Sequence, residues 1–132
     1  MKIDQKIIKT CQTQVTDIIA IYLFGSSGTV YETAESDVDI AVLSLAKLDM
    51  GKRLDLINAL IGVLHKDKVD VIDLRTAPVV LKFQVIMTGK RIFCSDLYAG
   101  DSFEMYTFSD YVRFNTERRE ILKAIRQRGS VF

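Results

Sequence analysis

Two aspartates separated by one residue, Asp37 and Asp39, are the side chains of this sequence best suited to chemistry. Residues two apart in a strand point to the same side, so both carboxylates would share one face. Like charges on one face repel, and Asp is uncommon in strands, so the pair requires a compensating cation. Oxygen ligands that leave positions open for phosphate and water are typical of Mg²⁺ sites. A solvent-facing edge strand with harmless acids is the structural alternative.

A glycine and two serines, Gly25, Ser26 and Ser27, follow directly after an apolar run from Ile18 to Phe24. Glycine allows close approach of the backbone to a ligand, and successive backbone N–H groups at such a turn form a concave anion site. We therefore expect these three residues to bind the phosphates of a nucleotide. An ordinary turn is the alternative, because Gly-Ser pairs are common turn residues.

A third carboxylate is available in the later run from Val69 to Leu74, which contains Asp70 and Asp73. Being three apart in a strand, the two face opposite sides, so only one can join the site. We favour Asp70, because Asp73 is near the strand end, where a turn or cap role is natural. Three acids around two Mg²⁺ ions would let one ion activate an attacking hydroxyl and the other hold a triphosphate. An acid near the attacking hydroxyl would also accept its proton.

The hydrophobic pattern predicts the elements that would position these residues. We expect helices over about residues 2–16, 48–64 and 78–88, and strands over about 18–24, 37–43, 69–74 and 91–94. One or two closing helices should run from an N-cap at Asp101 or Ser102 to Arg128. The second helix should bury one face, formed by Leu54, Ile57, Leu60, Ile61 and Leu64. The order predicts a mixed α/β (α+β) fold with a small mixed sheet flanked by helices.

Length and composition favour a single small domain. The 132 residues, 48% of them hydrophobic, supply one modest core, and we expect residues 98–132 to form a helical C-terminal extension. The N-terminus lacks a signal peptide and no window resembles a membrane span, which predicts a cytoplasmic protein. Cys11 and Cys94 lack metal-ligand spacing, so we expect two small buried hydrophobic residues and no disulfide.

Isolated cations and the histidine are expected to lie outside the site. His65, the single histidine, follows a predicted helix end, where a charge is favourable. Lys52 and Arg53 open the same helix and would be within reach of phosphates, but cations on an exposed helix face are common. We therefore leave these three residues out of the predicted site.

The C-terminal region differs in composition from the rest of the chain. The net charge of +1 argues against wholesale binding to nucleic acid or membrane. From Arg113 onward, however, the sequence contains six cations and only two anions. This excess fits a solvated helix face, a helix docking on an acidic partner or a weak nucleic-acid contact. Half or more of the local aromatic residues should be core, and the surplus predicts a partner surface. These residues are Tyr98, Phe103, Tyr106, Phe108, Tyr111 and Phe114.

The pattern Gly25-Ser26, then Asp37-x-Asp39, then an acid in a later strand resembles the signature of the DNA polymerase β-like nucleotidyltransferases. The short chain and strand order are similar to their minimal nucleotidyltransferase branch, over roughly residues 18–94. The resemblance implies Asp37, Asp39 and Asp70 as catalytic metal ligands, with Mg²⁺ as cofactor and ATP as substrate. Many such proteins are antitoxins of HEPN-domain ribonuclease toxins. The resemblance implies a hetero-oligomer in which AMP is transferred from ATP to a tyrosine of the toxin.

The chain departs from this family pattern at two positions. Members often carry Arg near the position of Thr29 and Gly near that of Val30, and neither is present here. A lost cation would weaken triphosphate binding, which keeps a binding-only antitoxin open as an alternative. A nucleotidyltransferase acting on a small molecule or an RNA end is a further alternative, although that class usually needs a larger substrate domain.

Overall fold

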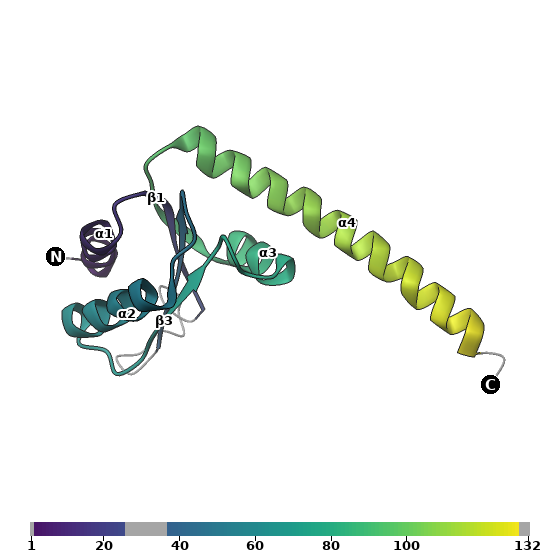
Figure 1. Ribbon diagram of the computed structural model, residues 1–132, viewed down its shortest axis with the longest axis horizontal. Helices are drawn as coiled ribbons and strands as arrows, with labels where there is room; N and C mark the ends of the chain where they lie inside the picture. Colours follow the sequence, from purple (N-terminus) through teal and green to yellow (C-terminus); the bar gives the residue numbers. More distant parts are fainter. Residues whose placement is uncertain (1, 26–36, 130–132) are drawn as a thin grey trace.

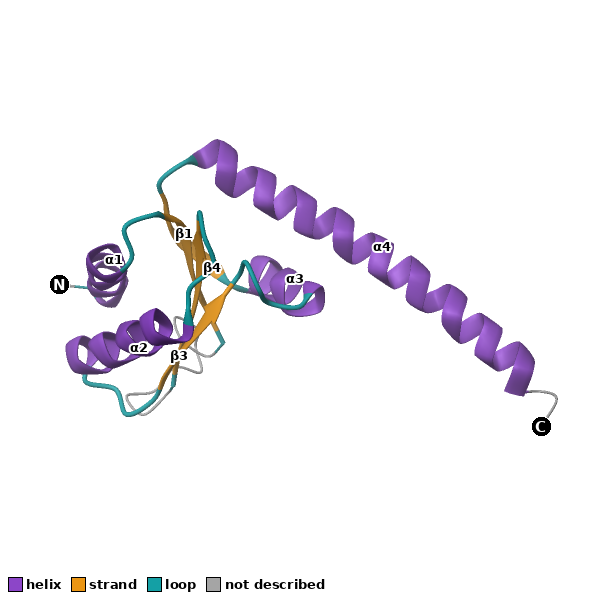
Figure 2. Cartoon of the chain, in the orientation of Figure 1, coloured by secondary structure: helices purple, strands orange, loops and turns teal. Residues whose placement is uncertain are grey.

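The computed structural model describes residues 2–25 and 37–129, which form helices and strands in the predicted order. Figure 1 follows them along the chain and Figure 2 separates helices from strands. The elements are α1 (Ile3–Gln14), β1 (Ile18–Phe24), β2 (Val38–Ser44), α2 (Met50–Leu64), β3 (Val69–Asp73), α3 (Val79–Thr88), β4 (Lys90–Cys94) and α4 (Leu97–Gly129).

The four strands form one mixed sheet in the order β3-β2-β1-β4. β1 pairs antiparallel with both β2 and β4, whereas β2 pairs parallel with β3, to which α2 connects it. Helices cover both faces, so the central strands β1 and β2 are apolar along nearly their whole length. The predicted fold class, a small mixed sheet flanked by helices, is confirmed.

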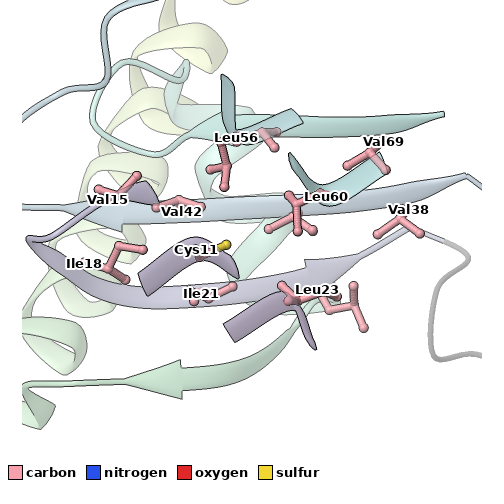
Figure 3. Close-up of a cluster of buried hydrophobic side chains, with 13 residues drawn as sticks. Cys11, Val15, Ile18, Ile21, Leu23, Val38, Val42, Leu56, Leu60 and Val69 are labelled. Carbon is pink, nitrogen blue, oxygen red and sulfur yellow. The ribbon is translucent and has the colours of Figure 1, made fainter. Parts of the chain in front are cut away.

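Two hydrophobic cores lie on opposite faces of the sheet. The core against α1 and α2 contains Cys11, Ile40, Leu56, Leu60 and Val71. Figure 3 shows the side chains of this core, which come from the two helices and from the strands of the sheet. The other core lies between the sheet, α3 and the first turns of α4. Burial raises the pKa of the Cys11 thiol to about 12, which keeps it neutral. Cys94 is only partly buried, so the prediction of two buried cysteines holds for Cys11 alone.

The buried face of α2 differs from the predicted one at two positions, Leu54 and Leu56. Leu54 is 53% exposed, whereas Leu56 and Leu60 are fully buried. Residues four apart share a helix face, so Leu56 and Leu60 form one stripe and Leu54 lies on the far side of it. The Asp49 carboxylate accepts a hydrogen bond from the Lys52 N–H at 2.7 Å and so sets where this helix begins.

The last helix is a single element of 33 residues that begins earlier than predicted. The Asp96 carboxylate, not Asp101 or Ser102, caps it by accepting a hydrogen bond from the Ala99 N–H at 3.1 Å. Its first turns pack against the sheet and α3, and the remainder extends away from the body (Figure 1). None of the helices within residues 2–25 and 37–129 combines the length and apolar character needed to cross a membrane.

Fewer aromatic residues of α4 join the core than the sequence predicts. Phe103 packs at the second core, and Tyr111 stacks on Phe83 with ring centroids 3.7 Å apart. The four others stay exposed. These are Tyr98, Tyr106, Phe108 and Phe114.

A polar network anchors the start of α4 to the sheet. The Tyr22 hydroxyl, buried in β1, donates a hydrogen bond to Glu104 Oε1 at 3.0 Å. Arg91 of β4 pairs with Glu104 at 3.3 Å and with Asp101 at 3.0 Å. Burial first, and then the Glu104 carboxylate, raise the pKa of Tyr22. The network therefore fixes the direction in which α4 leaves the sheet.

Replacing Tyr22 by Phe tests this anchor. Tyr22→Phe should lower the free energy of unfolding by about 1 kcal/mol, since one hydrogen bond is lost while Glu104 keeps its pairing with Arg91. Tyr106→Phe, at an exposed position of α4, is the matched control and should change it by less than about 0.5 kcal/mol. Urea denaturation measures both, and equal effects would contradict the anchoring role.

Candidate functional site

Three of the predicted site acids lie together where β2 and β3 begin. Asp39 is the register partner of Asp70 across the two parallel strands, and neighbouring strands lie about 4.8 Å apart. Asp37 is two positions before Asp39, immediately ahead of β2. Asp37 and Asp70 are exposed and Asp39 is half-buried. The structure brings the three carboxylates together, and their role in metal binding and catalysis stays a prediction.

Gly25 lies directly against the central acid. Its φ of +77° is in the left-handed region that favours glycine. A Cβ at this position would clash with the Asp39 carboxylate oxygen Oδ2, because β1 ends at Phe24 opposite Asp39. Close approach to a carboxylate thus accounts for a glycine here, and the predicted phosphate contact of Gly25 stays untested.

The surroundings of Asp39 disfavour its negative charge. Burial, followed by the nearby charges of Asp70 and Asp37, raises the pKa of Asp39, and Lys68 partly opposes this effect. A cation between these acids would relieve their repulsion. In the part of the chain that the structure describes, no three acidic, cysteine or histidine side chains form a ready-made metal cage. Mg²⁺ usually takes one or two protein carboxylates plus water and phosphates, so Asp39 and Asp70 fit as its ligands.

Two cations that the sequence analysis left out or did not consider lie beside the outer acids. Arg53 Nη2 is 3.7 Å from Asp70 Oδ1, and Lys68 Nζ is 3.8 Å from Asp37 Oδ2. Arg53 is three residues before Leu56, hence on the sheet-facing stripe of α2. That spacing was the available signal, but Arg53 was left out of the predicted site because cations on an exposed helix face are common.

Asp73 and His65 have structural roles. Both carboxylate oxygens of buried Asp73 accept backbone hydrogen bonds, from Leu48 N–H at 2.9 Å and from Arg75 N–H at 3.0 Å. This agrees with the turn or cap role predicted for Asp73 and leaves Asp70 beside Asp39. His65 is the C-cap of α2, with φ of 54°, and its N–H donates to the Ile61 carbonyl.

Part of the predicted site falls outside the described residues. Ser26 and Ser27, expected to bind phosphates, and Thr29 and Val30, where the chain departs from the family pattern, all belong to residues 26–36. Phosphate binding by the two serines stays a prediction.

The repulsion around Asp39 can be tested by removing its charge. Because the folded chain raises the pKa of Asp39, it binds that proton more tightly than the unfolded chain does. Wild type in EDTA should therefore lose stability as the pH rises from the ordinary Asp pKa through the raised folded value. Asp39→Asn should escape this loss and melt at a higher temperature near neutral pH, as measured by circular dichroism.

Addition of Mg²⁺ and ATP should reverse the order of the melting temperatures of wild type and Asp39→Asn. Mg²⁺ with ATP should raise the Tm of wild type and raise that of Asp39→Asn much less. Asp55→Asn, an exposed position on α2, is the matched control and should keep the wild-type gain. An equal gain in wild type and Asp39→Asn would remove this acid from the site.

Comparison with known proteins adds independent findings. The family model described as "Polymerase beta, Nucleotidyltransferase" matches residues 5–98. The chain is 36% identical over 119 residues to the protein adenylyltransferase MntA of Shewanella oneidensis, which covers 90% of this chain and 84% of that protein.

Solved structures agree over nearly the whole length. One is a chain from a crystal structure of a toxin–antitoxin with AMP-PNP, with a TM-score of 0.81 and 35% identity, covering 92% of this chain and 97% of that one. Another is from a complex of the tri-AMPylated Shewanella oneidensis HEPN toxin with its MNT antitoxin, with a TM-score of 0.78 and 35% identity over 93% and 95% of the two chains. The family match, the shared fold and the carboxylates beside Gly25 lead to one conclusion: this chain belongs to the polymerase β nucleotidyltransferase family.

Proposed function

We propose that this chain is an antitoxin that transfers AMP from ATP to a tyrosine of a cognate HEPN ribonuclease toxin and thereby neutralises it. The observation that carries the proposal is the placement of Asp39 beside Asp70 and against Gly25, in a member of a nucleotidyltransferase family. Similarity to a protein adenylyltransferase over 90% of the chain supports this acceptor class. So does similarity to the antitoxin found with a tri-AMPylated HEPN toxin.

The transfer forms one new bond to the α-phosphorus of ATP and breaks one existing bond. The tyrosine hydroxyl oxygen bonds to the α-phosphorus of ATP, the bond to the oxygen bridging to the β-phosphate breaks, and pyrophosphate leaves. The hydroxyl proton passes to a carboxylate or to water. Mg²⁺, when bound, would neutralise phosphate charge and lower the pKa of the attacking hydroxyl.

Different residues of this chain are proposed to bind the metal and the triphosphate. Asp39 and Asp70 supply adjacent oxygen ligands from two strands, and Asp37 adds a third carboxylate at the same end. Their strands are fixed in register by the core, which pre-organises the oxygens for a metal and its phosphates. Residues Ser26 and Ser27 are proposed to contact the triphosphate.

Catalysis is tested by incubating the chain with its toxin, ATP and Mg²⁺, and measuring AMP addition by intact mass. Wild type should add AMP and silence the ribonuclease. Asp37→Asn and Asp39→Asn should slow the transfer by about 100-fold or more, because each removes an oxygen ligand used in the transition state. Asp55→Asn should transfer at the wild-type rate.

The same assay separates an enzyme from a binding-only antitoxin. If wild type adds no AMP yet silences the toxin, and Asp37→Asn silences it equally, the catalytic proposal fails. Transfer to an RNA end or a small molecule, with the toxin left unmodified, would favour the remaining alternative.

The toxin-binding surface is proposed to lie on the projecting part of α4. Several large apolar side chains there are exposed, including Val112, Ile121, Leu122 and Ile125. A helix that extends away from the body gains little from packing within its own chain, so its apolar side chains are available to a partner. The cations of this region would add complementarity to an acidic surface.

Two substitutions on this surface test toxin binding without disturbing the body. Ile121→Gln combined with Ile125→Gln should weaken toxin binding by about tenfold or more, since interface energy concentrates in buried apolar anchors. Met87→Gln, at an exposed position of α3, is the matched control. Calorimetric titration with the toxin measures the affinity, and unchanged binding by the double variant would place the interface elsewhere.

A further inference from the structure

The two cations beside the site acids form loose ion pairs. The distances of 3.7 Å from Arg53 to Asp70 and 3.8 Å from Lys68 to Asp37 are too long for direct hydrogen bonds. The four side chains retain between 44% and 75% of their exposure. Exposed pairs of this kind add little to stability, so they can be exchanged for other partners at small cost.

The position of Arg53 follows from the topology of the sheet. Val69 and Val71 share a core with α2, so Asp70, which alternates with them, points to the opposite face. β3 is an edge strand, so the Arg53 side chain can reach Asp70 only around that edge. The Arg53–Asp70 ion pair therefore connects the two faces of the sheet beside Asp37, Asp39 and Asp70.

Charge balance suggests what this arrangement does. In the metal-free chain the guanidinium of Arg53 offsets an acid that would otherwise add to the repulsion around Asp39. A divalent cation at Asp39 and Asp70 would compete with Arg53 for the same carboxylate and repel its charge. A triphosphate arriving with that cation brings the opposite charge, and a planar guanidinium matches phosphate oxygens well.

We infer that Arg53 is an exchange cation: it pairs with Asp70 in the metal-free chain and moves to the triphosphate when Mg²⁺ and ATP bind. Lys68 lies beside Asp37 in the same way as Arg53 lies beside Asp70. The inference rests on the proposed function only in placing Mg²⁺ and ATP at this site. It assigns Arg53 a binding and positioning role, and it predicts opposite effects of its removal on the two ligands.

The test measures binding of Mg²⁺ alone, and then of AMP-PNP at saturating Mg²⁺, by calorimetry on the full chain. Arg53→Gln should bind Mg²⁺ about two- to fivefold more tightly, since the metal no longer displaces a cation. It should bind AMP-PNP about tenfold more weakly, since a charge-assisted phosphate contact is lost. Lys52→Gln, an exposed neighbour on the same helix, is the matched control and should change either affinity by less than about twofold.

A conservative variant separates charge from shape. Arg53→Lys should bind Mg²⁺ about as wild type does, while its AMP-PNP affinity should lie between those of wild type and Arg53→Gln. Thermal melts verify folding, and Arg53→Lys provides the comparison should Arg53→Gln prove unstable.

The outcomes distinguish this inference from the proposed function. Opposite shifts for the two ligands support the exchange, even if the toxin is then found unmodified, in which case only the proposed function fails. Equal behaviour of Arg53→Gln and Lys52→Gln in a chain that still transfers AMP overturns the exchange alone, as does a joint weakening of both ligands. Absence of Mg²⁺ and AMP-PNP binding in wild type overturns both.

Discussion

The parallel register between β2 and β3 is the constraint on which the site depends. It places Asp39 opposite Asp70, and a shift by one residue would turn one of them to the other face. Valine and isoleucine side chains that alternate with these acids enforce it, each contributing about 1.5–3 kcal/mol through burial. Repulsion between two partly solvated carboxylates is on the order of 1–4 kcal/mol. The core therefore outweighs the repulsion and holds the acids together, with the charge of Asp70 offset by a long ion pair to Arg53.

Burial divides the acids into ligand candidates and structural groups. Asp73 lies one strand position beyond Ile72, is nearly inaccessible, and uses both oxygens to cap backbone N–H groups. The side chains of Asp37 and Asp70 keep about half of their exposure, and each forms a long ion pair with a cation. A carboxylate already saturated by backbone donors has little to offer a metal, whereas a loosely paired one can exchange its partner.

The proposed toxin-binding surface on the long helix α4 lies apart from the acids of β2 and β3. Its 33 residues span about 50 Å, and the network of Tyr22, Arg91 and Glu104 fixes only its beginning. Isolated helical segments are marginal in water, so the projecting part gains most from a partner that covers its apolar side chains. An acceptor protein held there would be positioned by contacts with the helix rather than by the site itself.

Local periodicity in the sequence was enough to predict the order of the elements and the fold class, and the period of two in strands predicted a shared face for Asp37 and Asp39. The same period of two distinguished Asp70 from Asp73, because residues three apart in a strand cannot share a face. Tertiary structure alone decided that the Arg53 side chain reaches Asp70 around the edge of β3, and that most aromatic residues of α4 stay exposed. These depend on strand order and on where a helix leaves the body, which are set by contacts between residues distant in the chain.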